Sequence, residues 1–285
     1  MFSSFNYGGI HIISTTEEYR DTPSYWDRAS KRLTATTSIN MLNWSYKYMR
    51  ANLIRLCLKA ISIIKHPESP IKILKTDLWN EGVEFYKDVI NIVKKLSSVE
   101  INFFGVDISK LVIFKALNRL KYIYGVQTSI THLPFRDCSF DIIWDISTID
   151  HIPLKLREKV IEEYFRTLKS KGVLILITDS QNIFTKLTRS TILNNILGIN
   201  KDSIPSNPNL LKVQLQQYFE ILDEDCLDIG YAIRSFLFSG RKSRIFKFIL
   251  NKEPIFRALH KIESSSVSRF LTPISRQYFF ICRRS

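Results

Sequence analysis

The sequence predicts an α/β fold built on a doubly wound parallel sheet, and two observations support this prediction. Short, almost uninterrupted apolar runs recur through the middle of the 285-residue chain, and segments with a one-sided apolar period lie between them. Strands that are apolar on both faces are typical of a parallel sheet covered by helices. Right-handed crossovers between such strands then produce a doubly wound sheet.

The expected elements of this core alternate along the chain. We expect strands at residues 71–77, 101–107, 126–130, 140–146 and 172–178, and a closing strand at 277–282. Helices are expected at 81–96, from the capping residue Ser109 to about 122, and at 155–168. The pattern is looser after residue 179, where we expect helices at 182–198 and 241–262 and a strand around 232–237.

The segment before the first strand is expected to be mostly helical. Residues 1–20 show no clear period, and Asp21-Thr22-Pro23 is a typical helix start. A longer helix opens at Ser38, and His66-Pro67 ends it. Its one-sided apolar stripe predicts packing on the domain's own core, with a lid or a dimer seam as the alternatives. The stripe comprises Ile39, Leu42, Tyr46, Met49, Leu53, Leu56, Ala60 and Ile63.

These elements divide the chain into four parts. Residues 1–66 form an N-terminal helical extension or lid, and residues 67–180 form the core. Residues 181–270 form a helical insertion on the substrate side with a basic surface, and residues 271–285 supply the closing strand.

Composition favours an ordinary cytoplasmic globular protein. Hydrophobic residues make up 45% of the chain, and we find neither a membrane-spanning stretch nor a secretion signal. Cys57, Cys138, Cys226 and Cys282 form no CxxC pair, so we expect reduced thiols and no metal site. The net charge of +14 is concentrated after Arg241. This excess indicates either a solvated surface or a face that holds phosphates, lipid headgroups or an acidic substrate.

The chemistry of an open α/β sheet is expected beyond the carboxyl ends of its strands. Asp107 ends the second strand, where a carboxylate can accept hydrogen bonds from a ribose diol. Capping of the next helix is the alternative role, but Ser109 already suits it. The first turn, residues 75–81, has no glycine before Gly82 and contains two acids. Such a turn would repel a pyrophosphate but would suit a ligand with an ammonium and a sulfonium.

Four segments carry a resemblance to a known family. They are "FFGVDIS" at 103–109, "THLPFRDCSFDIIWDISTIDHIP" at 131–153, "YFRTLKSKGVLILITDS" at 164–180 and the closing "QYFFICRRS". In this combination they resemble the class I S-adenosylmethionine-dependent methyltransferases, of the type 11-like kind. The chain departs from that family's glycine-rich first turn, D-x-G-x-G, because it has "LKTDLWNEG" there. Lys75 then stands in the place of the usual acid, and Asp77 in that of the first glycine.

The resemblance implies a mostly parallel, seven-stranded, Rossmann-like sheet whose last strand is antiparallel. It also implies methyl transfer from S-adenosylmethionine to an oxygen or nitrogen atom of a small molecule, such as a metabolite, a natural-product intermediate or a sugar. Asp107 would bind the ribose, Ser129 and Ile130 the adenine, and Asp77 the methionine ammonium. The full expected cofactor-binding set is Lys75, Thr76, Asp77, Leu78, Asp107, Ile108, Ser129, Ile130, Asp145 and Ser147.

The acceptor side is expected to involve the loop after the fourth strand and the N-terminal aromatic residues. His151 is the expected general base, because its unperturbed pKa of about 6.5 suits that role, with Asp150 next. Tyr25, Trp26 and Trp44 are the expected substrate-binding residues.

Three other functions remain open on the sequence alone. The unusual first turn raises the possibility of an inactive methyltransferase-like protein that binds or assembles with a partner, including a second copy. The basic C-terminal part leaves an RNA or lipid acceptor open, although a small molecule is favoured. A nicotinamide-dependent oxidoreductase is disfavoured because the dinucleotide-binding glycines are missing.

Overall fold

The computed structural model describes the core of the chain and part of its surroundings. The described residues are 2–7, 10–15, 22–33, 44–64, 70–83, 88–120, 123–181, 204–228 and 275–285, with single positions between 254 and 273. The expected helix at 182–198, the expected strand at 232–237 and most of the basic helix at 241–262 lie outside these residues.

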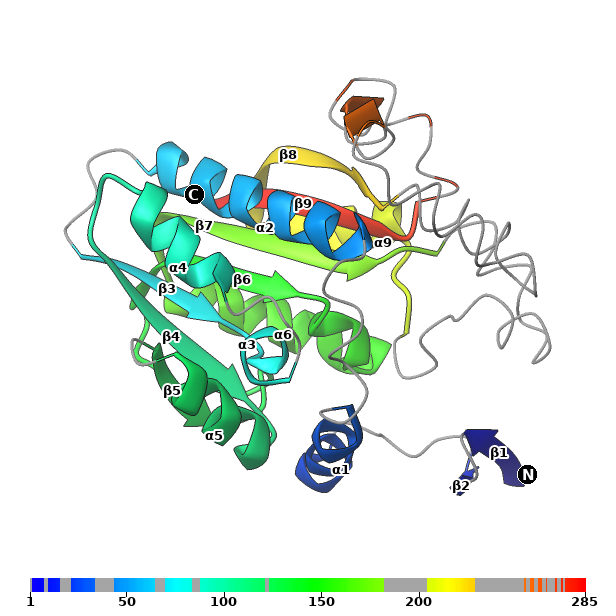
Figure 1. Ribbon diagram of the computed structural model, residues 1–285. Helices are drawn as coiled ribbons and strands as arrows, with labels where there is room; N and C mark the ends of the chain where they lie inside the picture. Colours follow the sequence, from blue (N-terminus) through cyan, green and yellow to red (C-terminus); the bar gives the residue numbers. More distant parts are fainter. Residues whose placement is uncertain are drawn as a thin grey trace.

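The described strands of the core form one seven-stranded sheet in the order β5-β4-β3-β6-β7-β9-β8 (Figure 1). Neighbours from β5 to β7 are parallel, whereas β9 runs antiparallel to both β7 and β8. This confirms the predicted mostly parallel sheet with an antiparallel last strand. The strands are β3 (Ile71–Lys75), β4 (Ile101–Asp107), β5 (Ile123–Gln127), β6 (Phe140–Ile146), β7 (Leu168–Asp179), β8 (Phe219–Leu227) and β9 (Gln277–Arg284).

Helices cover both faces of the sheet (Figure 1). On one face lie α2 (Trp44–Ile63), α4 (Asp88–Leu96) and α5 (Lys110–Arg119); on the other lie α6 (Leu154–Thr167) and α9 (Pro208–Gln216). Adjacent strand residues therefore enter different cores: Ile142 faces the first group of helices and Ile143 the second. This two-sided burial is the reason that the central strands are apolar at nearly every position.

The strand order reverses between β3 and β6. From β3 the chain continues to β4 and β5 on one side, and then crosses to β6 and β7 on the other. The loops that leave β3 and β6 therefore diverge, and they open a crevice at the carboxyl ends of these strands. Because β9 is antiparallel, its first residues lie at the same edge of the sheet.

The third strand of the core begins earlier than the sequence predicted. β5 spans Ile123–Gln127 rather than 126–130, so it includes Gly125. A Cβ at Gly125 would lie 2.8 Å from the Cγ2 atom of Ile113 on α5. Glycine is thus required in this strand because a helix packs closely on it, although in a sequence it is usually taken as a strand breaker.

The sequence predicted no strand at β8. Its sequence, FEILDEDCL, is rich in acids, which are depleted in strands. β8 is an edge strand, and its acids pair with basic residues of neighbouring elements: Asp223 with Lys59 at 2.6 Å and Glu220 with Arg283 at 2.6 Å. Charged residues are tolerated at an edge, where they discourage pairing with other chains.

The N-terminal region contains a hairpin in addition to its helices. β1 (Phe2–Tyr7) and β2 (Ile10–Thr15) pair in antiparallel fashion, in a segment where no period was evident. The first helix, α1 (Pro23–Leu33), begins at the expected proline. Two short helical segments follow strands of the core: α3 (Trp79–Gly82) after β3 and the 3₁₀ turn η2 (Ile149–His151) after β6.

The apolar stripe of α2 packs on the sheet. Leu53, Leu56 and Ala60 are at most 1% exposed and belong to the same core as β3 and β6. The stripe is therefore a core layer rather than a free lid or seam along these residues. Among the described helices, none has both the length and the apolarity that crossing a membrane requires.

Candidate active site

A cavity of about 380 Å³ lies in the crevice at the reversal of strand order. This volume is in the range of small-molecule sites. Several predicted site residues line it together: Trp26, Thr76, Asp77, Asp107, Ile108, Ser129, Ile130, Ser147 and His151. Other predicted residues are not among those that line the cavity, namely Tyr25, Lys75, Leu78, Asp145 and Asp150. Trp44 is the first residue of α2, and its side chain lies outside the described part of the structure.

Asp107 connects two loops at the rim of the cavity. Its Oδ2 accepts a hydrogen bond from the Leu78 amide at 3.0 Å, and its Oδ1 accepts one from the Ser109 amide at 2.8 Å. Ser109 caps α5, as predicted, by accepting from the Val112 amide at 3.1 Å. Each carboxylate oxygen can accept more than one hydrogen bond, so these amides orient Asp107 without excluding a diol.

The first turn also presents a carboxylate to the cavity. Asp77 Oδ1 accepts from the Trp79 amide at 3.0 Å, and Asp77 Oδ2 accepts from the Thr148 hydroxyl at 3.1 Å. The Thr148 hydroxyl lies 2.9 Å from that of Thr76. These contacts join the turn after β3 to the loop after β6, and they hold the Asp77 carboxylate at the point where the two loops separate.

Lys75 occupies the interior beneath this turn rather than the cavity wall. Its ammonium lies 2.9 Å from Glu81 Oε1 and 3.1 Å from Oε2, and both side chains are at most 2% exposed. The same ammonium lies 5.2 Å from the ring centre of Trp144. Burial alone would lower the pKa of Lys75. The carboxylates of Glu81 and Asp77 raise this pKa by more than burial lowers it, so the lysine stays charged.

A loop of residues 128–139 closes the other end of the cavity, and Ser129 and Ile130 contribute to the wall. Ser129 Oγ lies 3.0 Å from Thr131 Oγ1, and the Thr128 hydroxyl donates to the His132 carbonyl at 2.8 Å. Local side-chain hydrogen bonds of this kind stabilise a tight turn that has no helix or strand ladder.

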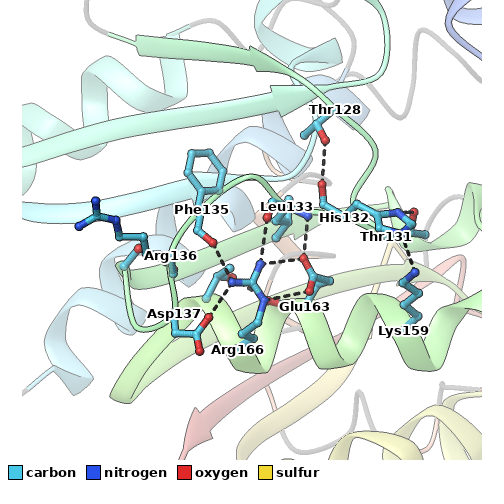
Figure 2. Close-up of polar contacts among 12 residues, drawn as sticks. Thr128, Thr131, His132, Leu133, Phe135, Arg136, Asp137, Lys159, Glu163 and Arg166 are labelled. Carbon is cyan, nitrogen blue, oxygen red and sulfur yellow. Dashed lines mark hydrogen bonds and ion pairs between the residues drawn. The ribbon is translucent and has the colours of Figure 1, made fainter.

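Arg166 on α6 holds the second half of this loop (Figure 2). Its guanidinium donates to the carbonyls of Leu133 at 2.9 Å and Phe135 at 2.7 Å, and to the carboxylate of Asp137 at 2.8 Å. Glu163 completes the network by accepting from both Arg166 and the Leu133 amide. The hydrogen bonds that Arg166 donates to Glu163 and Asp137 raise the pKa of Arg166, so the loop is fixed by a permanent charge.

Two of the predicted acids are fully buried below the cavity floor. Asp145 accepts from the Thr148 amide at 2.8 Å and from the Tyr164 hydroxyl at 2.7 Å, and burial raises its pKa to about 6. Asp150 accepts from the Thr178 hydroxyl and from the Asp179 amide, and burial together with the Asp179 charge raises its pKa well above the usual range. Both carboxyl groups support the loop after β6 from behind.

His151 and Trp26 are in direct edge-to-face contact, and both line the cavity. Their ring centres are 4.8 Å apart at an interplanar angle of 81°, and Trp26 also meets Trp79 edge to face at 5.4 Å. Tyr25 packs on Trp26 from outside, with ring centres 5.2 Å apart. α1 is held in this place by Asp27, which accepts from the Ser109 hydroxyl and from the Leu111 amide at 3.2 Å.

Several polar residues that complete the site are not among those predicted from the sequence. Arg276 and Gln277 line the cavity beside Asp179. Gln277 Nε2 donates to Ser147 Oγ at 3.0 Å and to Asp179 Oδ1 at 3.3 Å. An antiparallel closing strand begins at the edge where its parallel neighbours end, so the predicted topology could have pointed to these two residues.

Comparison with known proteins agrees with this arrangement. Residues 90–176 match the model of a family described as a methyltransferase domain. An uncharacterized protein from Haemophilus influenzae is 32% identical over 77 residues, which are 25% of this chain and 31% of that protein. The chain thus spans about a third of the length of this relative.

Solved structures share the fold across most of the chain. A protein provisionally assigned as a sarcosine dimethylglycine methyltransferase from Galdieria sulphuraria is 14% identical, with 91% of this chain and 98% of that chain covered and a TM-score of 0.55. The N-methyltransferase NodS from Bradyrhizobium japonicum, in complex with S-adenosyl-L-homocysteine, is 11% identical, with 90% and 97% covered and a TM-score of 0.53. Residues 90–176 thus resemble a methyltransferase domain, and these solved structures share the Rossmann-like methyltransferase fold that the strand order also shows.

Proposed function

We propose that the protein transfers a methyl group from S-adenosylmethionine to a nitrogen or oxygen atom of a small-molecule acceptor. The main support is the position of Asp107, a carboxylate that lines the cavity at the end of β4, beside the strands between which the strand order reverses. A carboxylate there is suited to a ribose diol, because each of its oxygens can accept one of the two hydroxyl protons.

The other cavity residues also fit this cofactor. Ile108 and Ile130 offer apolar surface for an adenine ring, with Ser129 beside them. Asp77 offers a carboxylate to the methionine ammonium, on the opposite side of Asp107 from the adenine loop. NodS, which shares the fold, was solved with S-adenosyl-L-homocysteine, and this supports the same ligand class here.

S-adenosylmethionine supplies an activated methyl group on its sulfonium, so the main task of the protein is positioning. Asp107 and Asp77 would hold the two ends of the cofactor. Trp26 would cover the acceptor, and His151 would accept a proton from it where the acceptor must lose one. Asp150 would act indirectly, since both of its oxygens are engaged behind the wall.

Calorimetry with two ligands tests the cofactor site. S-adenosyl-L-homocysteine carries a ribose and an ammonium, whereas 5′-methylthioadenosine carries only the ribose. Asp107→Asn should lower the affinity for both ligands by roughly tenfold or more, which is the effect of losing a charge-assisted hydrogen bond. Asp77→Asn should lower the affinity for S-adenosyl-L-homocysteine only. Glu158→Gln, an exposed acid-to-amide change on α6, is the control and should weaken neither ligand.

The outcomes separate the proposal from its alternatives. No heat from S-adenosylmethionine at sub-millimolar concentration would favour a binding protein that has lost the activity. If the cofactor binds, His151→Ala should lower turnover and leave calorimetric affinity nearly unchanged, and full activity in this variant would remove His151 from the mechanism. RNA binding that is tight and falls steeply with salt would instead favour an RNA acceptor.

A further inference from the structure

The end of the cavity near Asp179 has no role in the proposed cofactor contacts. Asp107 ends β4 and Asp77 follows β3, so a cofactor held by them lies over β4, β3 and the adjoining β6. Asp179 ends β7, two strands from β3, which corresponds to about 10 Å at the usual strand spacing. One ammonium cannot contact both Asp77 and Asp179, so Asp179 faces the space for the acceptor.

This end of the cavity is built from groups that are held in place. Gln277 is 4% exposed, and its amide nitrogen bridges Ser147 and Asp179. The Gln277 Oε1 atom is buried and has no hydrogen-bond partner among the described residues. A buried acceptor atom without a partner is costly and uncommon, so a donor from a ligand would satisfy it.

The charges at this end favour a cation. Arg276 lies 3.8 Å from a carboxylate oxygen of Asp179 and 3.8 Å from one of Asp228. The Asp179 carboxylate therefore stands at this end of the cavity. It would attract a protonated amine and repel an anionic acceptor such as a carboxylate or a phosphate ester.

Aromatic side chains also line this cavity. Trp26, Trp79 and His151 line the cavity, and the rings of the two tryptophans meet edge to face. The faces of tryptophan rings attract ammonium groups, including methylated ones. A cavity lined by both carboxylates and aromatic rings is a chemical environment suited to an amine that gains methyl groups.

We propose that the acceptor is a small primary or secondary amine, bound as its ammonium form to Asp179 with Gln277 Oε1 as a second hydrogen-bond acceptor. This inference rests on the proposed function and specifies its substrate class. One N–H proton passes to His151 or to water, which frees the nitrogen lone pair. The lone pair forms the new N–C bond while the S–C bond breaks, and the sulfur keeps that electron pair as a neutral thioether.

The test uses matched amine and alcohol probes on the full chain saturated with S-adenosyl-L-homocysteine. The pairs are phenethylamine with 2-phenylethanol, putrescine with 1,4-butanediol, and glucosamine with glucose, each titrated by calorimetry and by thermal shift. At least one amine should bind about tenfold or more tightly than its alcohol, as expected for a charge-assisted hydrogen bond. Asp179→Asn should remove this preference and keep the affinity for S-adenosyl-L-homocysteine, and Glu158→Gln should preserve both.

Each result decides the inference. Amines that bind no better than their alcohols, or no binding by any amine at millimolar concentration, would overturn it even if Asp179→Asn fails to fold. An amine preference that persists in Asp179→Asn would also overturn it. Absence of S-adenosyl-L-homocysteine binding by the unmodified protein is a separate failure, that of the proposed cofactor.

Discussion

The buried ion pair between Lys75 and Glu81 gives the sharpest prediction about this fold. Glu81→Gln would leave the Lys75 ammonium in the interior without the carboxylate that lies 2.9 Å away. Breaking a buried pair by removing one partner costs about 3–5 kcal/mol, because the remaining charge is not compensated. Total stabilities are about 5–15 kcal/mol, so this single change should remove a large fraction of the stability of the protein.

The double variant should behave differently from the sum of the single ones. Lys75→Met and Glu81→Gln each remove one charge, but together they leave no uncompensated charge, and a neutral pair of similar volume is often as stable as the ion pair. We therefore expect the double variant to recover most of the loss, with a coupling of about 3 kcal/mol or more between the two sites.

Urea unfolding followed by tryptophan fluorescence and circular dichroism measures these free energies. Lys59→Met is the matched control, since it breaks an ion pair of 2.6 Å in which the lysine is 43% exposed. Such exposed pairs contribute about 0–1 kcal/mol. A Glu81→Gln protein that loses no more stability than Lys59→Met, or a double variant as unstable as the two single losses added, would refute this account of the pair.

Three further outcomes are expected. Burial raises the pKa of Asp145 to about 6, so the folded protein keeps a proton there that the unfolded chain has released, and stability should fall as the pH rises from about 4 to about 6. Asp145→Asn should reduce that fall in urea unfolding, and unchanged pH dependence would contradict it. Arg166→Met should destabilise the 128–139 loop by about 1–3 kcal/mol. It should also lower the calorimetric affinity for S-adenosyl-L-homocysteine. Arg136→Met, which changes an exposed residue of the same loop, should have neither effect. A thiol reagent should label exposed Cys138 first in mass spectrometry and leave Cys57 unmodified in the folded protein, because burial raises the pKa of Cys57 to about 12; equal rates at both would count against the fold.

The sequence was most informative where one physical cause dominates. β4 and β6 have the predicted bounds, because strands buried on both faces are apolar along their whole length. Ser109 was found as a helix cap from its side chain alone. β8 was missed because its acids are stabilised by basic partners far away in sequence, such as Lys59. In the sequence Lys75 and Glu81 resemble two surface charges, and only the fold shows that they form an ion pair in the interior.

The missing glycines of the first turn are explained by the packing around it. A Cβ at Gly105 would lie 2.3 Å from Leu78, and a Cβ at Gly82 would lie 2.6 Å from the Val112 carbonyl. The close approaches therefore occur on either side of the turn, at β4 and at the end of α3, instead of within it. With those contacts made elsewhere, the turn itself can carry side chains, and the Asp77 carboxylate takes a position that a glycine leaves empty.

Asp107 then joins this turn to the rest of the site. Its two oxygens accept from the Leu78 amide of the turn and from the Ser109 amide at the start of α5. The hydroxyl of Ser109 donates to Asp27 on α1, the helix that brings Trp26 to the cavity. A ribose bound to Asp107 would therefore contact a continuous series of hydrogen bonds that runs from the first turn to α1. Cofactor binding and the placement of the aromatic wall of the acceptor site are thus expected to be coupled through this carboxylate, because both depend on the same hydrogen bonds.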